Sequence, residues 1–472
     1  MENLQTVDIG PLRPERFRTV LGDDYPKFAV AVELGRELFD GRVIWNVNST
    51  AKGGGVAEML RSLLAYARGG EVDARWVVVR GNPDFFRVTK RIHNNLHGAK
   101  GDGGPLGPAE KDVYESALAP NAQELAAIVS PGDVVILHDP QTAGLCTAVK
   151  QAGAIVLWRC HVGLDTPNDT ARAAWDFLRP HLSEADAYIF SRRAFVWDDL
   201  ADDKIEIIPP SIDAFSPKNQ DMTSDEVDAV LTAAGVIEGS AVTAEPTFIR
   251  VDGSEDRIVN RADVASGGAI PATDRLVVQV SRWDRLKDPI GVMEGFAQHV
   301  APAAGVRLAL AGPAVEEVAD DPEGADVLAE VRTAWDQLDP SVRDRIHLVC
   351  LPMEDGEENA AMVNALQRKA EIVVQKSLAE GFGLTVAEGM WKGRPVVASR
   401  IGGIQDQIDH GVSGLLLDDP RDQREFGTAL LSLIDDRERA AEMGVAARER
   451  VRRGFLGARH LMQYLDLIAR LL

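Results

Sequence analysis

Short apolar runs alternate with helix-length stretches along the first half of the chain. Each run is continuous, rich in β-branched residues and followed by polar residues, which is typical of parallel strands buried on both faces. Helical stretches such as residues 56–70 lie between some of these runs. The alternation indicates a doubly wound α/β domain. Its expected strands are residues 42–49, 73–81, 133–140, 154–162, 187–193 and 205–211.

The alternation stops near residue 215 and resumes near residue 273. The segment between is acidic and rich in Gly, Ala and Thr. Its pattern predicts a helix over residues 224–236 and a hairpin over residues 247–263, with Asp252-Gly253 as the turn. We interpret residues 216–272 as a linker with an insertion.

A second alternation fills the rest of the chain and ends in an amphipathic helix over residues 457–472. The predicted fold class is α/β, with two Rossmann-like doubly wound domains facing across a cleft. The domains are expected at residues 1–215, joined by the C-terminal helix 456–472, and at residues 273–455. Ligands of such sheets bind at the carboxyl ends of the strands. The second set of expected strands is residues 275–282, 306–313, 345–352, 371–377, 394–400 and 414–419.

Charge and composition narrow the classes of function. The 472 residues carry a net charge of −22, which argues against binding to nucleic acid or an anionic membrane. The start has no apolar signal core, and no run of about 20 apolar residues occurs. The three widely spaced cysteines fit free thiols in a reducing compartment. We therefore expect a cytoplasmic protein that binds any phosphate through a local basic site.

Three consecutive glycines, Gly53, Gly54 and Gly55, lie between an expected strand and an expected helix. Glycine lets the backbone approach a ligand closely, and the amides here would point from the positive end of the helix. The motif is neither G-x-G-x-x-G nor a P-loop. A ligand-binding loop and a surface turn both fit it.

Two cations follow the first strand of the second domain. Arg282 and Lys287 lie on the turn before a helix in which Asp288 is the expected N-cap and Pro289 the first residue. Cations at a helix N-terminus oppose the helix dipole unless an anion lies between them. A diphosphate would satisfy this arrangement, and solvated surface cations are the alternative.

The stretch SLAEGFGLTVAEGMWKG places Glu380 before a glycine turn and Glu388 eight residues later. Amides near Gly383, Leu384 and Thr385 would open a helix and suit a phosphate. Carboxylates accept hydrogen bonds from hydroxyls, so the two glutamates could orient a sugar and a ribose. The alternative is a structural capping box formed by Thr385 and Glu388.

Polar side chains also follow two strands of the first domain. His138, Asp139 and Gln141 follow one strand, and Arg159 and His161 end the next. Polar groups at neighbouring strand ends can line a ligand site. A satisfied structural histidine is the alternative for His161.

Motifs for metal-dependent or hydrolytic chemistry are not found. The sequence has no D-x-D pair for a metal–diphosphate, no H-E-x-x-H and no G-x-S-x-G. We therefore expect no metal site, although a metal could stimulate the reaction.

With these residues identified, the chain resembles a retaining glycosyltransferase of the two-Rossmann (GT-B) type. The Glu380/Glu388 spacing and the Arg282/Lys287 pair resemble the family that includes sucrose and trehalose synthases. A closer resemblance is to the group of trehalose glycosyltransferring synthases and trehalose phosphorylases. It rests on stretches that occur in the same order from about residue 40: VNSTAKGGGVAEML, HDPQ, WRCHVGLDTPN, PPSID, QVSRWDRLKDP, EGFGLTVAEGMWKG and GGIQDQI.

This resemblance implies reversible transfer of glucose from a nucleoside diphosphate glucose to glucose, forming α,α-trehalose with retention. It implies that Arg282 and Lys287 neutralise the departing diphosphate. Glu380 would hold hydroxyls of the donor sugar, Glu388 the ribose, and His161 would lie near the donor sugar.

Further contacts are assigned on the same basis. The three glycines and residues 383–385 are expected on the donor side, with Asp139, Gln141 and Arg159 in the sugar pocket. The sequence does not choose between UDP-, ADP- and GDP-glucose, and no tightly bound cofactor is expected. Expected partners are small sugars and the nucleotide sugar, with a homodimer as a candidate assembly. Residues 221–272 and the stretch SRRAFVWDDL depart from the family pattern and could alter the acceptor pocket.

Three other functions remain open at this point. A trehalose phosphorylase would use inorganic phosphate, and a related glucosyltransferase would use another acceptor. A nucleotide-sugar binding module would lack catalysis, although the complete set of two cations and two glutamates argues against it.

Overall fold

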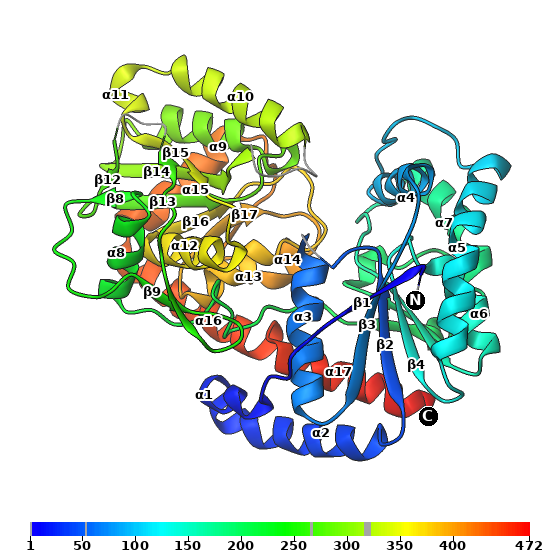
Figure 1. Cartoon of the computed structure of the whole chain (residues 1–472). Coiled ribbons are helices and arrows are strands. Elements are labelled where there is room, and N and C mark those ends of the chain that lie inside the picture. Colours follow the sequence, from blue (N-terminus) through cyan, green and yellow to red (C-terminus); the bar gives the residue numbers. More distant parts are fainter. Residues whose placement is uncertain (1, 52–53, 265–267, 316–321) are drawn as a thin grey trace. The chain divides into compact units, whose positions relative to one another are not determined.

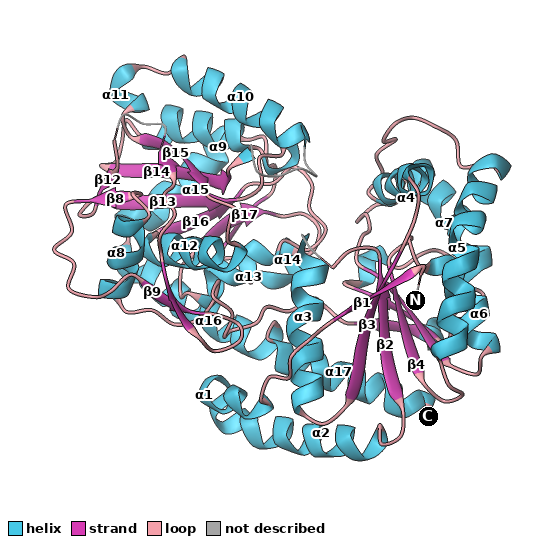
Figure 2. Cartoon of the chain, in the orientation of Figure 1, coloured by secondary structure: helices cyan, strands magenta, loops and turns pink. Residues whose placement is uncertain are grey.

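The chain forms two compact units in a computed structural model, which describes residues 2–51, 54–264, 268–315 and 322–472. The first unit comprises Met1–Ser211 and Phe455–Leu472, and the second comprises Ile212–Gly454. The C-terminal helix thus returns to the first unit, and residues 216–272 lie within the second unit. Each unit contains a seven-stranded sheet with helices on both faces (Figures 1 and 2).

The sheet of the first unit has the order β1-β3-β2-β4-β5-β6-β7. All neighbours pair in parallel except β1, which is antiparallel to β3. The six strands expected from the apolar runs are confirmed, and β1 is an added edge strand. The bounds are β1 Leu4–Val7, β2 Val43–Asn48, β3 Asp73–Val79, β4 Val134–His138, β5 Ile155–Cys160, β6 Ala187–Phe190 and β7 Ile205–Ile207.

Helices cover both faces of this sheet because its strands are apolar on both sides. The C-terminal helix α17, red in Figure 1, packs against α2 and α3. The helices are α1 Arg18–Leu21, α2 Tyr25–Leu38, α3 Gly54–Gly69, α4 Pro83–Leu96, α5 Pro108–Ile128, α6 Cys146–Gln151, α7 Asp169–Leu182 and α17 Gly457–Leu471.

The main sheet of the second unit has the order β11-β15-β14-β13-β16-β17-β18. Its six long strands are parallel and confirm the second predicted alternation, while β11 pairs antiparallel with β15. The bounds are β11 Asp263–Val264, β13 Arg275–Val280, β14 Val306–Pro313, β15 Ile346–Leu351, β16 Ile372–Gln375, β17 Val396–Ser399 and β18 Leu415–Leu417.

The helices of the second unit include a helix predicted in the acidic segment, α8. Thr223 caps it with a hydroxyl that accepts a hydrogen bond from the Glu226 amide, and the Glu226 carboxylate accepts one from the Thr223 amide. The helices are α8 Ser224–Ala233, α9 Pro289–Gly295, α10 Pro322–Asp336, α11 Pro340–Arg343, α12 Gly356–Lys369, α13 Leu384–Trp391, α14 Ile404–Gln407, α15 Gln423–Asp435 and α16 Arg437–Gly454.

The acidic segment contributes strands as well as a helix. The predicted hairpin is confirmed by β9 Thr247–Ile249 and β10 Glu255–Arg257, which pair antiparallel around a turn where Gly253 has a φ of 89°. Two short strands, β8 Ile237–Glu238 and β12 Ile270–Pro271, pair in parallel. Since β11 also comes from this segment and joins the main sheet, the segment is built into the second unit.

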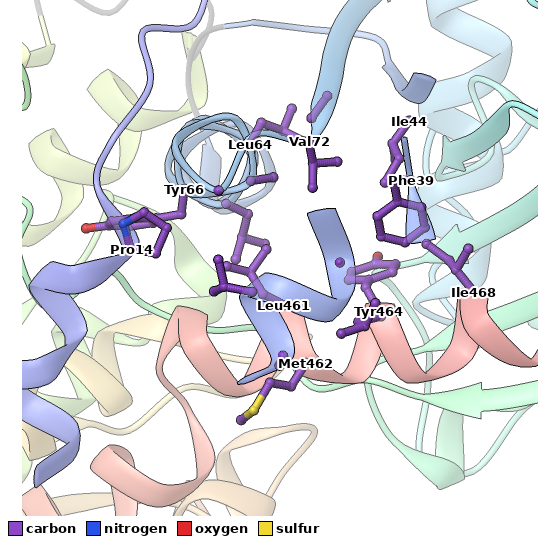
Figure 3. Close-up of a pocket in the computed structure, with 18 of the residues that line it drawn as sticks. Pro14, Phe39, Ile44, Leu64, Tyr66, Val72, Leu461, Met462, Tyr464 and Ile468 are labelled. Carbon is purple, nitrogen blue, oxygen red and sulfur yellow. The ribbon is translucent and has the colours of Figure 1, made fainter. Parts of the chain in front are cut away.

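The core of the first unit leaves a cavity of about 110 Å³ where α17 packs on α2 and α3 (Figure 3). Its wall is almost entirely apolar, and Phe39, Leu64 and Ile468 lie on it (Figure 3). Asn46, Tyr66 and Tyr464 are the lining residues with polar side-chain atoms. The underside of α17 is therefore packed incompletely at this place.

Candidate active site

The strand order creates a reversal point in each parallel sheet. In the second unit, β13 and β16 are neighbours, but the chain leaves them toward opposite edges: β14 and β15 lie on one side, β17 and β18 on the other. Ligands of open α/β sheets bind outside the carboxyl ends of the strands at such a point. Arg282 and Lys287, the expected cations, follow β13, and Glu380 follows β16.

A close ion pair joins the two strand ends. The Nζ atom of Lys287 lies 2.5 Å from the Oε2 atom of Glu380, and the side chains are 17% and 12% exposed. The backbone amide of Leu378 also donates to the carbonyl of Leu286 over 2.7 Å. The turn after β13 and the loop after β16 are thus held together, and the structure brings Lys287 and Glu380 into one site.

Arg282 lies on the same turn as Lys287, five residues earlier, and its side chain is exposed to solvent. Its side chain is 65% exposed, and Nη2 lies 3.3 Å from an oxygen of Asp284. The planar fork of a guanidinium matches the geometry of phosphate oxygens.

The helix that follows the cationic turn begins as predicted. Asp288 is the N-cap of α9, accepting a hydrogen bond from the Gly291 amide, and Pro289 is the first helical residue. Asp288 has a left-handed φ of 51°. Its carboxylate also binds Lys376, which is fully buried at the end of β16. Sequence analysis did not single out Lys376, although a lysine ending an apolar strand was a signal.

The loop after β16 is shaped by glycine, and the capping-box alternative for Thr385 and Glu388 is wrong. The N-cap of α13 is Gly383, with a φ of 76°, and no side chain caps the helix. Gln407 donates to the carbonyl of Phe382 over 2.5 Å. Gly402 packs so closely on this loop that a Cβ atom there would lie 2.0 Å from the carbonyl oxygen of Glu380. The GGIQDQI stretch is therefore the support of the Glu380 loop.

Glu388 is on α13, and its side chain is buried. Its side chain is 8% exposed and lies 3.6 Å from the Nζ atom of Lys218. Lys392, one turn further, is also buried and donates to the Glu388 carbonyl and to Asn219. The segment before α8 thus borders the Glu388 carboxylate, which sequence analysis had not predicted.

The reversal point of the first sheet lies between β2 and β4. The glycine loop follows β2, and Asp139 follows β4. Gly54 has a φ of 78°, a conformation that favours glycine, and opens α3 together with Gly55. Gly53 lies outside the described residues. Gln141 is half-buried next to Asp139.

A chain of hydrogen bonds crosses the ends of β2, β4 and β5. Arg159 Nε donates to His161 Nδ1 over 3.4 Å, so His161 Nδ1 is the acceptor nitrogen. His161 Nε2 then carries the proton and faces His138 Nδ1 at 3.1 Å. His138 Nε2 in turn donates to Asn46 Oδ1 over 3.0 Å. A guanidinium can only donate, so Arg159 sets the tautomer of both imidazoles.

Arg159 is fully buried, and its N–H groups donate hydrogen bonds to residues of the first unit. They reach Tyr464 at 2.9 Å, His460 at 3.3 Å and the Ile208 carbonyl at 2.9 Å. The expectation that Arg159 contacts a sugar is therefore not supported, because the side chain has no exposed surface. It acts on His161 instead. Helix α17 supplies two of its acceptors, His460 and Tyr464. Two polar residues four apart on this amphipathic helix were the missed signal.

Asp139 positions the backbone of the same cluster. It has a left-handed φ of 62°, and Oδ1 accepts a hydrogen bond from the His161 amide over 2.8 Å. Its carbonyl accepts a hydrogen bond from Trp158 Nε1 over 3.1 Å. The strained backbone and these bonds fix the residue after β4 against the carboxyl end of β5.

Burial governs the charges of this cluster. Desolvation, with the nearby Arg159 charge, lowers the pKa of His138 to about 3 and the pKa of His161 and His460 well below the ordinary range. Desolvation raises the pKa of Asp139 to about 7, against the opposing effects of the His161 amide and Arg159. The imidazoles are therefore neutral at pH 7, as the tautomer chain requires.

No cluster of three or more metal-binding side chains occurs in the part of the chain that the structure describes. The same residues contain no helix with the length and apolar character needed to cross a lipid bilayer.

Comparison with known proteins places this geometry in a family. Residues 46–197 match the family described as trehalose synthase, N-terminal domain, and residues 355–450 match glycosyl transferases group 1. The chain is 33% identical to a trehalose synthase of Pyrococcus horikoshii over 99% of both chains. It is also 33% identical to a trehalose synthase of Rubrobacter xylanophilus over 99% of both. A trehalose phosphorylase of Pleurotus sajor-caju is 27% identical, covering 85% of this chain and 54% of the phosphorylase.

Solved structures support the fold. An α,α-trehalose-phosphate synthase (UDP-forming) from Burkholderia vietnamiensis matches with a TM-score of 0.63 at 16% identity, over 91% of this chain and 100% of that one. Anabaena Alr3699/HepE in complex with UDP and glucose matches with a TM-score of 0.60 at 15% identity, over 91% and 100%. With the two parallel sheets, these matches confirm the GT-B fold. The chain belongs to the trehalose synthase family and is a trehalose-related glycosyltransferase.

Proposed function

We propose that the protein transfers glucose from a nucleoside diphosphate glucose to glucose and forms α,α-trehalose with retention. The observation that carries the proposal is the grouping of Lys287, Glu380 and Arg282 at the reversal point of the second sheet. Two cations beside one carboxylate offer partners for a diphosphate and for sugar hydroxyls.

In this mechanism, Arg282 and Lys287 bind the diphosphate and stabilise the charge that develops as its bond to the anomeric carbon breaks. On phosphate binding, the Lys287 ammonium is shared between the diphosphate and Glu380. Glu380 then accepts hydrogen bonds from hydroxyls of the donor glucose, and Glu388 accepts them from the ribose. The protein therefore supplies position and charge stabilisation.

Retention is proposed to arise from attack on the face that the diphosphate leaves. The acceptor hydroxyl forms the new bond to the anomeric carbon, and a leaving phosphate oxygen takes its proton. No carboxylate nucleophile has been identified from the sequence for the two-step alternative. His161 is proposed to lie near the donor sugar, oriented by Arg159 and Asp139. The bound species are the nucleotide sugar and glucose, with no other cofactor.

The direct test incubates the protein with UDP-, ADP- or GDP-glucose plus free glucose and identifies the sugar products. Trehalose that appears only with a nucleotide glucose supports the proposal. Breakdown of trehalose by inorganic phosphate alone would instead establish a phosphorylase. Tight binding of a nucleotide glucose without any product would indicate a binding module.

A further inference from the structure

The second unit also has a cavity, of about 410 Å³. It lies at the amino ends of β13 and β16, the strands that Arg282 and Lys376 follow. Arg275, the first residue of β13, and Glu371, which precedes β16, both line it. A strand rises about 3.3 Å per residue, so roughly 20 Å separates this cavity from the cationic turn after β13. We call it the basic cavity.

The basic cavity gathers positive charge in an acidic chain. Five cationic side chains line it against three carboxylates, whereas the whole chain has a net charge of −22. A local excess of one sign in a hollow concentrates counter-ions of the other sign. The cationic residues are Arg275, Arg368, Lys369, Arg394 and Arg437.

The carboxylates of the lining are already paired. Both oxygens of Glu371 accept hydrogen bonds from Arg275 over 2.6 Å, and one also lies 3.4 Å from Arg437. Asp228 lies 2.8 Å from Lys369. The third carboxylate, Asp274, pairs with Arg307, which does not line the cavity. These bidentate and direct contacts leave little carboxylate capacity for the remaining cations.

This pairing leaves out Arg368, which binds Asp221 outside the lining over 3.0 Å, and Arg394. Arg394 is the cation that then remains. One of its terminal nitrogens donates to the main-chain carbonyl of Arg368. Its Nε atom is buried and makes no hydrogen bond within the described chain, and no described carboxylate lies at ion-pair distance. Burial lowers the pKa of Arg394, opposed by the charge of Glu371. A desolvated guanidinium with an unused donor is costly unless an anion reaches it.

Arg437 provides a second point of contact at the rim. It is the first residue of α16, its side chain is 72% exposed, and it shares Glu371 with Arg275. An anion in the cavity could therefore lie between the Arg394 guanidinium and the exposed Arg437 guanidinium at the rim. The volume is within the range of pockets that hold small ligands, about 300–1,000 Å³.

We propose that the basic cavity binds a small phosphorylated anion through Arg394 and Arg437. Phosphate oxygens match the fork of a guanidinium, and a phosphate in the cavity would supply the negative charge that Arg394 lacks among its neighbours. The site is separate from the proposed donor site, because it lies at the amino ends of the same strands. The phosphate group is the shared chemistry of two ligand sources, free phosphate and a sugar phosphate.

The test measures binding of inorganic phosphate to the full chain by calorimetry at low ionic strength. It uses the Arg282→Ala background, because the proposed function expects this change to weaken phosphate binding at the carboxyl ends of the strands. We expect one site, weakened about tenfold or more by Arg394→Gln, because the variant loses a charged partner for the phosphate. Arg437→Ala should weaken it severalfold without affecting folding. Arg439→Ala, an exposed change on the same helix, should leave it unchanged.

A hexose monophosphate serves as the second probe. If it binds at least tenfold more tightly than inorganic phosphate and loses that advantage in Arg394→Gln, a sugar phosphate is the occupant. Equal affinities would indicate free phosphate. The proposal is overturned if neither probe binds up to roughly 10 mM, or if both bind the Arg394→Gln and Arg437→Ala proteins as tightly as the background protein. Loss of the folded state in Arg394→Gln does not remove the test, because Arg437 lies at the surface.

Discussion

Lys287 Nζ lies 2.5 Å from Glu380 Oε2, although the two residues are 93 positions apart in the chain. The contact forms because β13 and β16 are adjacent in the sheet, so that their carboxyl ends deliver both residues to one edge. In the proposed reaction the same contact orders the carboxylate that binds the donor sugar. The following predictions test this site and the structure that supports it.

Removal of the exposed cation should abolish most turnover and leave the fold intact. Arg282→Ala is expected to lower kcat about 10²–10³-fold, the usual effect of removing one preorganised charge or donor from a transition state. The side chain is 65% exposed, so its loss should not change the melting temperature appreciably. Steady-state kinetics and calorimetry provide the measurement.

The matched control for that variant is Arg285→Ala. Arg285 is on the same turn and half exposed, but it pairs with Glu323 and Glu330 instead of facing the strand end. Near-normal turnover is expected. If Arg282→Ala were as active as Arg285→Ala, the role assigned to Arg282 would be refuted.

The glycine that supports the Glu380 loop should be intolerant of a side chain. Gly402 has a φ of 47°, and a Cβ atom there would lie 2.0 Å from the Glu380 carbonyl oxygen. Gly402→Ala must therefore displace this loop, and a shift of about 1 Å at a reacting group can cost about 100-fold in rate. We expect kcat to fall by that order in a protein that still folds.

Gly411→Ala separates loop displacement from backbone strain. Gly411 also has a positive φ, 82°, but nothing lies within 4 Å of the added Cβ atom. This variant should lose stability to a similar degree and keep its turnover. Equal activity losses in the two variants would show that displacement of Glu380 is not the cause.

The buried imidazoles should make the first unit sensitive to acid. His138, with a folded pKa of about 3, is protonated between about pH 3 and 6.5 only when the chain is unfolded. Stability therefore falls as the pH drops through this window, and His161 and His460 act in the same direction. Asp139 opposes them, because its raised pKa of about 7 keeps a proton on the folded chain above pH 3.8.

Three histidines against one aspartate leave a net loss of stability on acidification. Each net proton is worth about 1.4 kcal/mol per pH unit. Urea unfolding of the first unit, followed by tryptophan fluorescence between pH 7 and 5, should show this slope. His138→Gln should reduce proton uptake on unfolding by about one. An unchanged pH slope in that variant would contradict the assignment of a neutral, buried His138.

Filling the cavity under the C-terminal helix should stabilise the first unit. A Cβ atom on Gly35 of α2 would meet Leu465 at 3.8 Å and Phe39 at 4.0 Å, which are ordinary contacts. The cavity has room for it (Figure 3). Gly35→Ala should raise the free energy of unfolding by about 0.5–1 kcal/mol, chiefly because alanine restricts the unfolded chain. Denaturant titration is the measurement.

A second helical glycine gives the opposite expectation. A Cβ atom on Gly69 of α3 would lie 1.8 Å from the carbonyl oxygen of Leu12, so Gly69→Ala should destabilise the unit by about 1–3 kcal/mol. If both variants changed stability in the same direction, the packing around Gly35 or Gly69 would differ from that described.

Local patterns were sufficient for the parallel strands of the two main sheets, the α8 helix, the β9–β10 hairpin and the N-cap of α9. Each depends on neighbours in sequence: a continuous apolar run, an Asp-Gly turn, or an aspartate before a proline. The C-terminal helix was also evident from its apolar face. The capping box at Thr385 and Glu388 failed because a left-handed glycine and the distant GGIQDQI stretch determine how α13 begins.

The sequence by itself determined the α/β class, the strand positions and the residue types available for a phosphate and a sugar. Only the tertiary structure decided which of those residues meet. Strand order brings Lys287 to Glu380, and the return of α17 turns Arg159 from an expected sugar ligand into the buried donor that orients His161. The physical reason is that periodicity encodes which face of an element is buried, whereas contacts between distant segments depend on the order in which the strands pair.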